Sequence, residues 1–280
     1  MPKHSLGTFG TMLDELASRP DPYPTYAALR ARGAHAHDDG RWVVARSADV
    51  EAVLASPSAV VGFVPPADDH DRRRSLAIAR LAELAPSQLQ AAAYAATAER
   101  LTAAPGPTVE LMGLVARDVP IAVLAAALGA DPALTPTAAL LLQAVDATAG
   151  LIGNSILARS RHRPAVRDGL VEATSRFDPP VQLTTRVAAR PIELPYVTIP
   201  TDATVVVLLA AANHDPDCRE PFGFGAEPRR CPGSSAATTL ASGVVDAVVE
   251  RCAPELVDPE VTYEARPNLR IPSRVRLDLA

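Results

Sequence analysis

The ten residues "FGAEPRRCPG" (224–233) decide how the rest of the chain is interpreted. Cys231 lies between Arg229 and Arg230 and a Pro-Gly pair, directly before an Ala/Val-rich run that predicts a helix. Amide groups at a helix N-terminus and nearby guanidinium groups both favour an anion, so this setting predicts a lowered thiol pKa. Cys231 is therefore a candidate nucleophile or metal ligand. The alternative is a buried structural cysteine flanked by surface arginines.

The composition of the 280 residues is that of a globular protein, and we expect a single domain over 1–280. Apolar residues make up 48% of the chain, and the net charge of −5 without a dense Lys/Arg run argues against a nucleic-acid partner. The three cysteines show neither zinc-site nor disulfide spacing. The longest apolar run (203–212) is too short to span a bilayer, and the N-terminus lacks a signal-peptide core. We therefore expect a cytoplasmic protein that contacts no membrane.

The hydrophobic pattern predicts a mainly helical protein with a smaller β portion and no strict βαβ alternation. We expect helices over 21–33, 47–56, 68–86, 86–104, 135–159, 165–177 and 234–252. A further helical stretch over 108–130 should break at Pro120. Strands are expected over 41–47 and in the segments between 181 and 213, and the tail (268–280) reads as a β-hairpin.

The stretch around Cys231 resembles the haem-binding loop of the cytochrome P-450 family, F-G-x-G-x-[HR]-x-C-x-G. The matching residues are Phe224, Gly225, Arg229, Cys231 and Gly233, and Glu227 stands where the family has a glycine. The resemblance implies that the chain binds haem b and that the Cys231 thiolate is the axial ligand of the iron. It also implies that Phe224, Gly225 and Gly233 shape the loop against the cofactor.

Other segments extend this resemblance over nearly the whole chain. "HDRRR" (70–74) resembles the family's H-x-x-x-R helix motif, and Arg186 in "DPPVQLTTRVAA" falls on a propionate-binding arginine. The resemblance implies that His70, Arg74, Arg186 and Arg229 hold the two haem propionates. "LLLQAVDATAGLIGN" (140–154) resembles the long helix that crosses the haem. The expected fold is therefore a cytochrome P-450-like fold that lacks most of the lid helices and the meander.

Two segments are much shorter than in that family. Only "ADPALTP" (130–136) stands where the family has the lid helices over the substrate. Only "CREP" (218–221) stands for the longer meander near the redox-partner surface. An open distal face would lose the exclusion of water that protects reactive intermediates.

Single residues depart from the family as well. Arg176 matches the arginine of the family's E-x-x-R pair, but Ala173 replaces the glutamate, so we expect Arg176 to lack its usual partner. In the long helix Ala147 replaces the proton-delivery threonine. Asp146 and Thr148 beside it are then the candidate catalytic residues.

Two functions fit these observations. In the first, the chain is a haem-thiolate monooxygenase, impaired by the departures, that oxidises a small natural-product-like substrate with electrons from a donor such as a ferredoxin. In the second, it is a haem-free or silent relative that binds and activates a glycosyltransferase. The apolar surface left by the missing lid would then be the docking patch.

Overall fold

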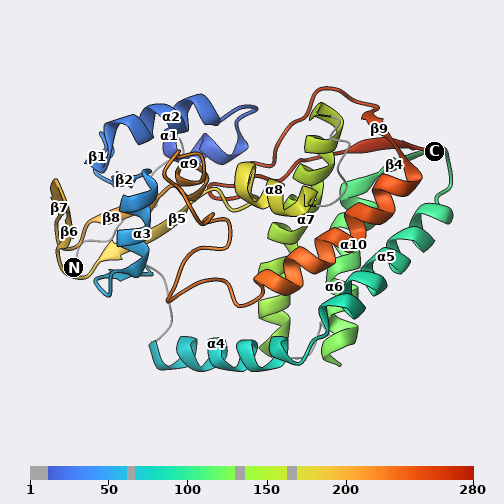
Figure 1. Ribbon diagram of the computed structural model, residues 1–280, viewed down its shortest axis with the longest axis horizontal. Helices are drawn as coiled ribbons and strands as arrows, with labels where there is room; N and C mark the ends of the chain where they lie inside the picture. The colour runs from blue at the N-terminus through green and yellow to red at the C-terminus, as the bar shows by residue number, and fades with distance from the viewer. Residues whose placement is uncertain (1–11, 62–66, 130–135, 163–168) are drawn as a thin grey trace, which may run out of the picture.

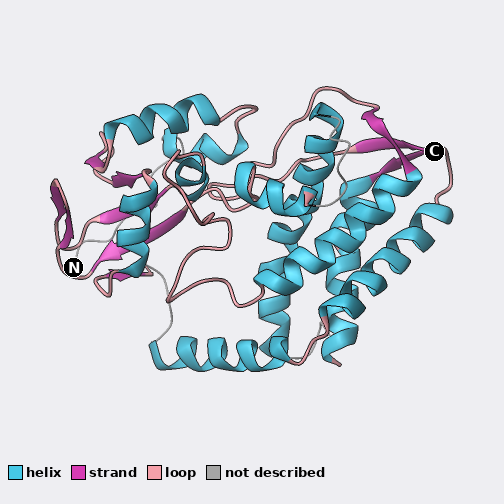
Figure 2. Ribbon diagram, in the orientation of Figure 1, coloured by secondary structure: helices cyan, strands magenta, loops and turns pink. Residues whose placement is uncertain are grey.

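The computed structural model describes residues 12–61, 67–129, 136–162 and 169–280 of the chain. Helices gather at one end of the molecule and a five-stranded sheet at the other (Figures 1 and 2). A long loop from His214 to Gly233, here called the cysteine loop, runs from the sheet end to the helical end. The expected mainly helical fold with a smaller β portion is thus confirmed.

The helical end is built around one large apolar core. Its helices are α5 (Pro86–Thr102), α6 (Asp118–Leu128), α7 (Pro136–His162), α8 (Leu170–Phe177) and α10 (Ser234–Arg251). Fully buried side chains such as Leu101, Ile152 and Val244 join these helices. A three-stranded sheet in the order β4 (Thr108–Glu110), β10 (Arg276–Leu279), β9 (Cys252–Leu256) closes this end.

The sheet end contains five strands in the order β1 (His35–Ala36), β2 (Trp42–Val44), β8 (Thr204–Val207), β5 (Thr184–Ala188) and β3 (Ala59–Val60). Strands β2 and β8 are parallel, with Val43 opposite Val206, and the other pairs are antiparallel. The valines of β2 and β8 are almost completely buried because helices cover this part of the sheet.

Short elements surround this sheet. They are α1 (Met12–Glu15), η1 (Leu16–Ser18), α2 (Tyr23–Arg32), α3 (Ser47–Ala55), α9 (Leu209–Asn213) and the hairpin of β6 (Ile192–Leu194) and β7 (Val197–Ile199). Helix α2 ends at Gly33, whose φ of 73° favours glycine, as its sequence predicted. Helix α4 (Ala67–Ala82) lies along one side of the molecule, below the cysteine loop in Figure 1.

Four expectations about secondary structure were wrong. Residues 108–110 form strand β4, because they pair with β10, and a π-helix, η2 (Met112–Ala116), follows. Pro120 lies in the first turn of α6, where its missing N–H is not needed, so it breaks nothing. Only the first part of 203–213 is a strand, and β10 pairs with β4 and β9 instead of forming a hairpin within the tail.

Among the residues described, no helix has both the length and the apolar character needed to cross a membrane.

Candidate functional site

The cysteine loop folds back on itself immediately before α10. The Gly225 N–H donates to the Phe222 carbonyl at 2.8 Å, and the Cys231 N–H donates to the Phe224 carbonyl at 2.9 Å. Gly225 has a φ of 73°, a backbone conformation that favours glycine. The half-buried Phe224 side chain packs against the core of the helical end. The loop is therefore anchored through Phe224, and Cys231 is exposed.

Cys231 is an exposed cysteine three residues before the start of α10. Protein on its inner side raises the pKa of the thiol by desolvation, and this outweighs the opposing effects of the Gly233 N–H, Arg74 and Arg230. The prediction that its setting alone would lower the thiol pKa was therefore wrong, because desolvation is the larger effect. The helix end and the guanidinium groups act in the predicted direction without prevailing.

Gly233 lies beside Cys231 and Leu81, with room for a Cβ atom in ordinary contact. A Cβ atom placed on Gly233 would lie 3.9 Å from the Cys231 Sγ and 3.9 Å from the Leu81 Cδ1 of α4. Its φ of −90° is ordinary, so the expectation of an unusual dihedral is not met there. What Gly233 provides is room beside the sulfur.

Arg74 approaches the cysteine loop from α4. Its Nη2 donates to the Arg230 carbonyl at 2.6 Å and lies 3.5 Å from the Pro228 carbonyl. Arg74, Ala77 and Leu81 are spaced i, i+3 and i+7, so they share the face of α4 that meets the loop. The side chain of His70, the other residue of the predicted motif, lies outside the described residues. Arg74 thus lies beside Cys231, and the structure gives it main-chain partners.

Arg186 and Arg229 are close enough for their charges to interact. Desolvation and the charge of Arg229 lower the pKa of Arg186. Arg186 donates to the Thr184 Oγ1 at 2.7 Å and to the Thr185 carbonyl at 2.9 Å, but no ion pair with a described acidic residue involves either arginine. Two neighbouring guanidinium groups, one of them partly buried, favour the binding of an anion. The two carboxylates of a porphyrin fit this arrangement, so the described residues fit the predicted cofactor.

The candidate catalytic residues Asp146 and Thr148 lie on α7 and differ in their surroundings. Asp146 Oδ2 lies 3.2 Å from Arg266 Nη2, and Asp146 Oδ1 lies 4.0 Å from Arg117 Nε. Glu264 pairs with both of these arginines. Thr148 is buried, with 4% of its surface exposed. Asp146 therefore belongs to an ion-pair network that joins α7 to the segment around 264–266, and the catalytic roles of both residues stay predictions.

Arg176 finds partners although Ala173 replaces the expected glutamate. Its Nη2 donates to the Cys218 carbonyl at 2.7 Å, its Nη1 lies 3.4 Å from the Arg219 carbonyl, and its guanidinium lies over the Phe177 ring at 5.7 Å. Main-chain carbonyl groups of the cysteine loop therefore take the place of the missing carboxylate.

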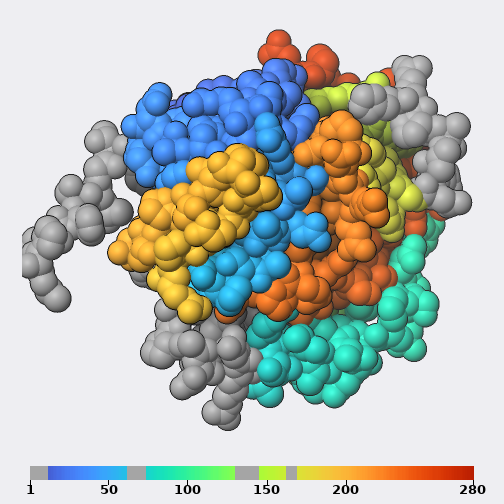
Figure 3. Space-filling model, turned by 60° about the vertical axis from the view of Figure 1, so that its left-hand side comes forward, coloured from blue at the N-terminus to red at the C-terminus, as the bar shows by residue number. Residues whose placement is uncertain are grey.

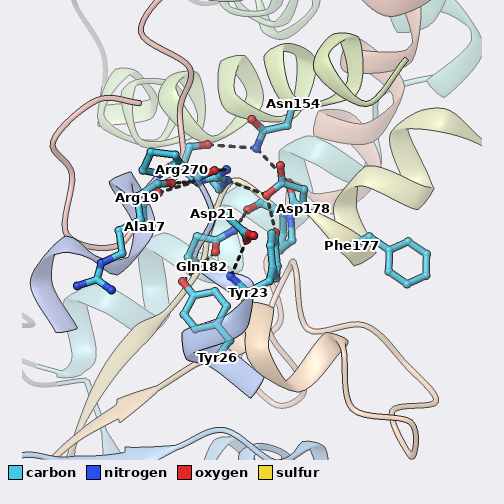
Figure 4. A network of polar contacts seen from close by, with 12 residues as sticks. Ala17, Arg19, Asp21, Tyr23, Tyr26, Asn154, Phe177, Asp178, Gln182 and Arg270 are labelled. Carbon is cyan, nitrogen blue, oxygen red and sulfur yellow. Dashed lines mark hydrogen bonds and ion pairs between the residues drawn. The ribbon is translucent and has the colours of Figure 1, made fainter. Parts of the chain in front are cut away.

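A buried polar network behind β5 had no sequence signal (Figure 4). Arg270, with 1% of its surface exposed, donates to the Asp178 carboxylate at 2.9 Å and to the carbonyl groups of Ala17, Arg19 and Pro20. Tyr23 donates to the same carboxylate, and its pKa is strongly raised by burial and by Asp178. The network fixes the segment that leads into β5, and hence the strand that carries Arg186.

A cavity of 220 Å³ lies elsewhere in the protein. It is lined by Leu13, Asp14, Arg41, Leu183, Thr184, Thr185, Val206, Pro267 and Asn268. Cys231 is not among the lining residues. Figure 3 shows the orange segment that contains the cysteine loop open at the surface, with teal atoms below it.

Comparisons with known proteins found relatives by sequence and by structure. No protein-family model matches it. It is 35% identical over 177 residues to Protein DesVIII of Streptomyces venezuelae, covering 59% of this chain and 38% of that protein. It is 41% identical over 86 residues to the putative cytochrome P450 140 of Mycobacterium tuberculosis, covering 28% of this chain and 20% of that protein. The chain thus matches less than two fifths of the length of either curated relative.

The fold agrees with these sequence relationships. The cytochrome P450 CYP109Q5 from Chondromyces apiculatus superposes on the chain with a TM-score of 0.81 at 20% identity, covering 95% of this chain and 96% of that one. The fold predicted from the cysteine-loop motif is confirmed by this superposition.

Proposed function

We propose that this chain, a member of the cytochrome P450 family in fold and in sequence relationship, binds haem through Cys231 and oxidises a small natural-product-like molecule. One observation carries the proposal: Arg186 and Arg229 lie close together without an acidic partner among the described residues, and Arg229 stands two residues before an exposed cysteine. Two like charges, one of them on a half-buried side chain, repel each other, and an anion bound between them would relieve this repulsion. A porphyrin bound at Cys231 would bring two carboxylates.

The described residues suggest how each part of such a cofactor would be held. When bound, the haem would supply oxygen activation, and the Cys231 thiolate would hold its iron. Arg186 from β5 and Arg229 from the cysteine loop would bind and orient the carboxylates. The Gly233 N–H and the Arg74 and Arg230 guanidinium groups would stabilise the negative charge on the sulfur. Thr148 and Asp146 are the proposed proton-handling groups. The reaction would also need electrons from a donor protein such as a ferredoxin.

The experiment is a titration of the purified chain with haemin, followed by absorption spectroscopy of the reduced protein under carbon monoxide. We expect a thiolate-type Soret band from the wild-type chain. Cys231→Ser should keep the pigment and lose the thiolate-type band. Cys218→Ser, which changes a buried cysteine of the same loop, should leave the spectrum unchanged. A wild-type chain that takes up no haemin would refute the proposal.

A second function is supported by the open face of the molecule. Leu76 and Ile78 of α4 are 58% and 46% exposed, and Cys231 beside this helix is exposed as well. Exposed apolar side chains are suited to a protein partner, although these two point to different sides of α4. The alternative function is therefore that of a haem-free relative that binds a glycosyltransferase. Co-purification of the haem-free chain with a glycosyltransferase, and loss of that binding in Leu76→Asp, would support it. Equal binding of the glycosyltransferase by the wild-type chain and by Leu76→Asp would count against this surface.

A further inference from the structure

We propose that the 220 Å³ cavity at the sheet end is a second ligand site, and that it takes a small uncharged molecule with an apolar ring and a hydroxyl group. This site is independent of the proposed haem function, because the cavity and the Arg186 side chain lie on opposite faces of the sheet. Three features support it: the face on which the cavity lies, the hydrogen-bonding groups at its opening, and the pairing of its charged residues.

The cavity lies on the face of the sheet that packs against α1. In the antiparallel pair of β5 and β8, Thr185 lies opposite Val206, and the next residue, Arg186, lies opposite Val205. Directly opposite residues project to the same face, and neighbours along a strand project to opposite faces. Val206 belongs to the apolar core that contains Leu13 of α1, whereas Val205 belongs to the other core of the sheet end. Thr185 therefore points to the side of the cavity, and Arg186 points to the other side.

The inner wall of the cavity is apolar and its opening is polar. Leu13, Leu183 and Val206 line the cavity and are only 1%, 7% and 2% exposed, so they form the inner wall. Thr185 and Asn268 also line it and are exposed, so they lie at the opening. An apolar cavity of about 150 Å³ is known to bind benzene. A volume of 220 Å³ therefore has room for a six-membered ring with a short substituent.

Two uncharged side chains at the opening are free to bind a ligand. In the part of the chain that the structure describes, neither the Thr185 hydroxyl nor the Asn268 side-chain amide has a hydrogen-bond partner. Each of these groups can both donate and accept a hydrogen bond. A ligand hydroxyl also donates and accepts, so it can bind both side chains at once while an apolar ring fills the inner part of the cavity.

The charged residues of the cavity are already paired. The Arg41 Nη1 donates to the Asp14 carboxylate at 2.8 Å, and the Arg41 Nη2 donates to the Asp39 carboxylate at 2.7 Å. A carboxylate ligand would therefore meet a guanidinium group that two carboxylates already surround. An ammonium ligand would have to compete with Arg41 for Asp14, and it would lose hydration beside the apolar wall. An uncharged ligand meets neither obstacle.

The test uses benzyl alcohol as the probe and measures its binding to the haem-free chain by saturation-transfer NMR. We expect saturable binding with a Kd on the order of 1 mM for so small a molecule. Benzoate and benzylamine keep the ring and carry a charge in place of the hydroxyl, so each should bind at least about 5-fold more weakly. Equal affinities for the three probes would overturn the assignment of an uncharged ligand.

Variants of Thr185 show whether the probe binds in this cavity. Thr185→Val removes the hydroxyl at nearly constant volume, and it should weaken the binding of benzyl alcohol roughly 5-fold, as for one lost hydrogen bond. Thr185→Phe should abolish binding, because the new ring fills the cavity. Thr198→Val is the matched control, since Thr198 is an exposed threonine of β7 that does not line the cavity, and its affinity should equal that of the wild-type chain.

Wild-type affinity in a folded Thr185→Phe chain, or no saturable binding of benzyl alcohol by the wild-type chain, would overturn the proposal. Cys231→Ser should bind benzyl alcohol as the wild-type chain does, because Cys231 does not line the cavity. The outcome is separate from that of the haemin titration. A chain that binds benzyl alcohol and takes up no haemin would refute the proposed function and support the second ligand site.

Discussion

The Arg270 guanidinium and the Asp178 carboxylate form an ion pair at 2.9 Å, with side chains that are 2% and 22% exposed. The centroid of the Tyr263 ring lies 3.5 Å from the guanidinium carbon of Arg270. Few arginines in a soluble protein are this enclosed, and three main-chain carbonyl groups complete its hydrogen bonds. This pair connects the N-terminal segment, α7 and the strand that carries Arg186 (Figure 4).

Replacing Arg270 with methionine should lower the free energy of unfolding by about 3–5 kcal/mol, because Asp178 and three carbonyl groups lose their donor. The matched control is Arg274→Met, since Arg274 is 62% exposed and pairs with Asp258 at the surface. It should change stability by less than about 1 kcal/mol. Urea denaturation of both variants measures the difference. Equal midpoints would show that the buried pair does not brace the fold.

Gly243 lets α10 approach α5 closely. A Cβ atom there would overlap the Gln90 carbonyl and lie 2.9 Å from the Ala93 Cβ. Gly243→Ala should therefore destabilise the chain by about 1–3 kcal/mol through overpacking, even though alanine favours helices. Gly106→Ala is the control, because nothing lies within 4 Å of a Cβ atom at that position. Thermal melts of the two variants should separate clearly, and similar melting temperatures would contradict the close approach.

The proximity of Arg186 and Arg229 predicts an unusual response to salt in the haem-free chain. Since Arg229 lowers the pKa of Arg186, the two charges repel each other. Arg186→Gln should remove this repulsion, so added salt should stabilise the wild-type chain more than the variant. Arg176→Gln removes an arginine that does not face Arg229, so added salt should stabilise this variant as much as it stabilises the wild-type chain. The measurement is the urea midpoint at low and high salt, and parallel shifts in all three proteins would refute it.

Asp39 predicts a pH dependence at the sheet end. Burial raises its pKa, but hydrogen bonds from Arg41 act more strongly together and lower it from 3.8 to about 2. A lowered native pKa means that the stabilisation is present above about pH 4 and is lost as the pH falls toward 2. Asp39→Asn should therefore be less stable than wild type at neutral pH, by no more than about 1 kcal/mol because the group is partly solvated.

The difference between wild type and Asp39→Asn should shrink as the pH is lowered from 4 to about 2. Asp38→Asn is the neighbouring control, because Asp38 is exposed. A wild-type advantage that is the same at pH 2 and pH 7 would rule out Asp39 as its source.

Local sequence signals predicted much of the helical structure. Helices α2, α3, α5 and α10 carry clear start or stop residues, such as the proline at the start of α5 and Gly33 after α2. Strands β4 and β10 could not be found in this way. They pair over a long sequence distance, and residues 108–110 continue smoothly into a helical pattern. Pairing with a distant strand overrides local propensity there.

The sequence predicted those parts of the candidate site that depend on the type of side chain. The motif identified Cys231, Arg229 and Gly225, and the order of segments identified Arg74 and Arg186. It did not show that Arg74 and Arg176 bind main-chain carbonyl groups, because such acceptors are the same in every residue. The direction of the Cys231 pKa shift could not be predicted either, because desolvation depends on the packing around the loop and not on the residues adjacent in sequence.

The parallel pairing of β2 with β8 has a consequence for synthesis of the protein in the cell. Trp42 lies opposite Val205, roughly 160 residues later in the chain. During translation the apolar β2 segment leaves the ribosome long before its partner exists. Until then its main-chain edge is open to wrong partners, so this region is where chaperone assistance during production of the chain should matter most.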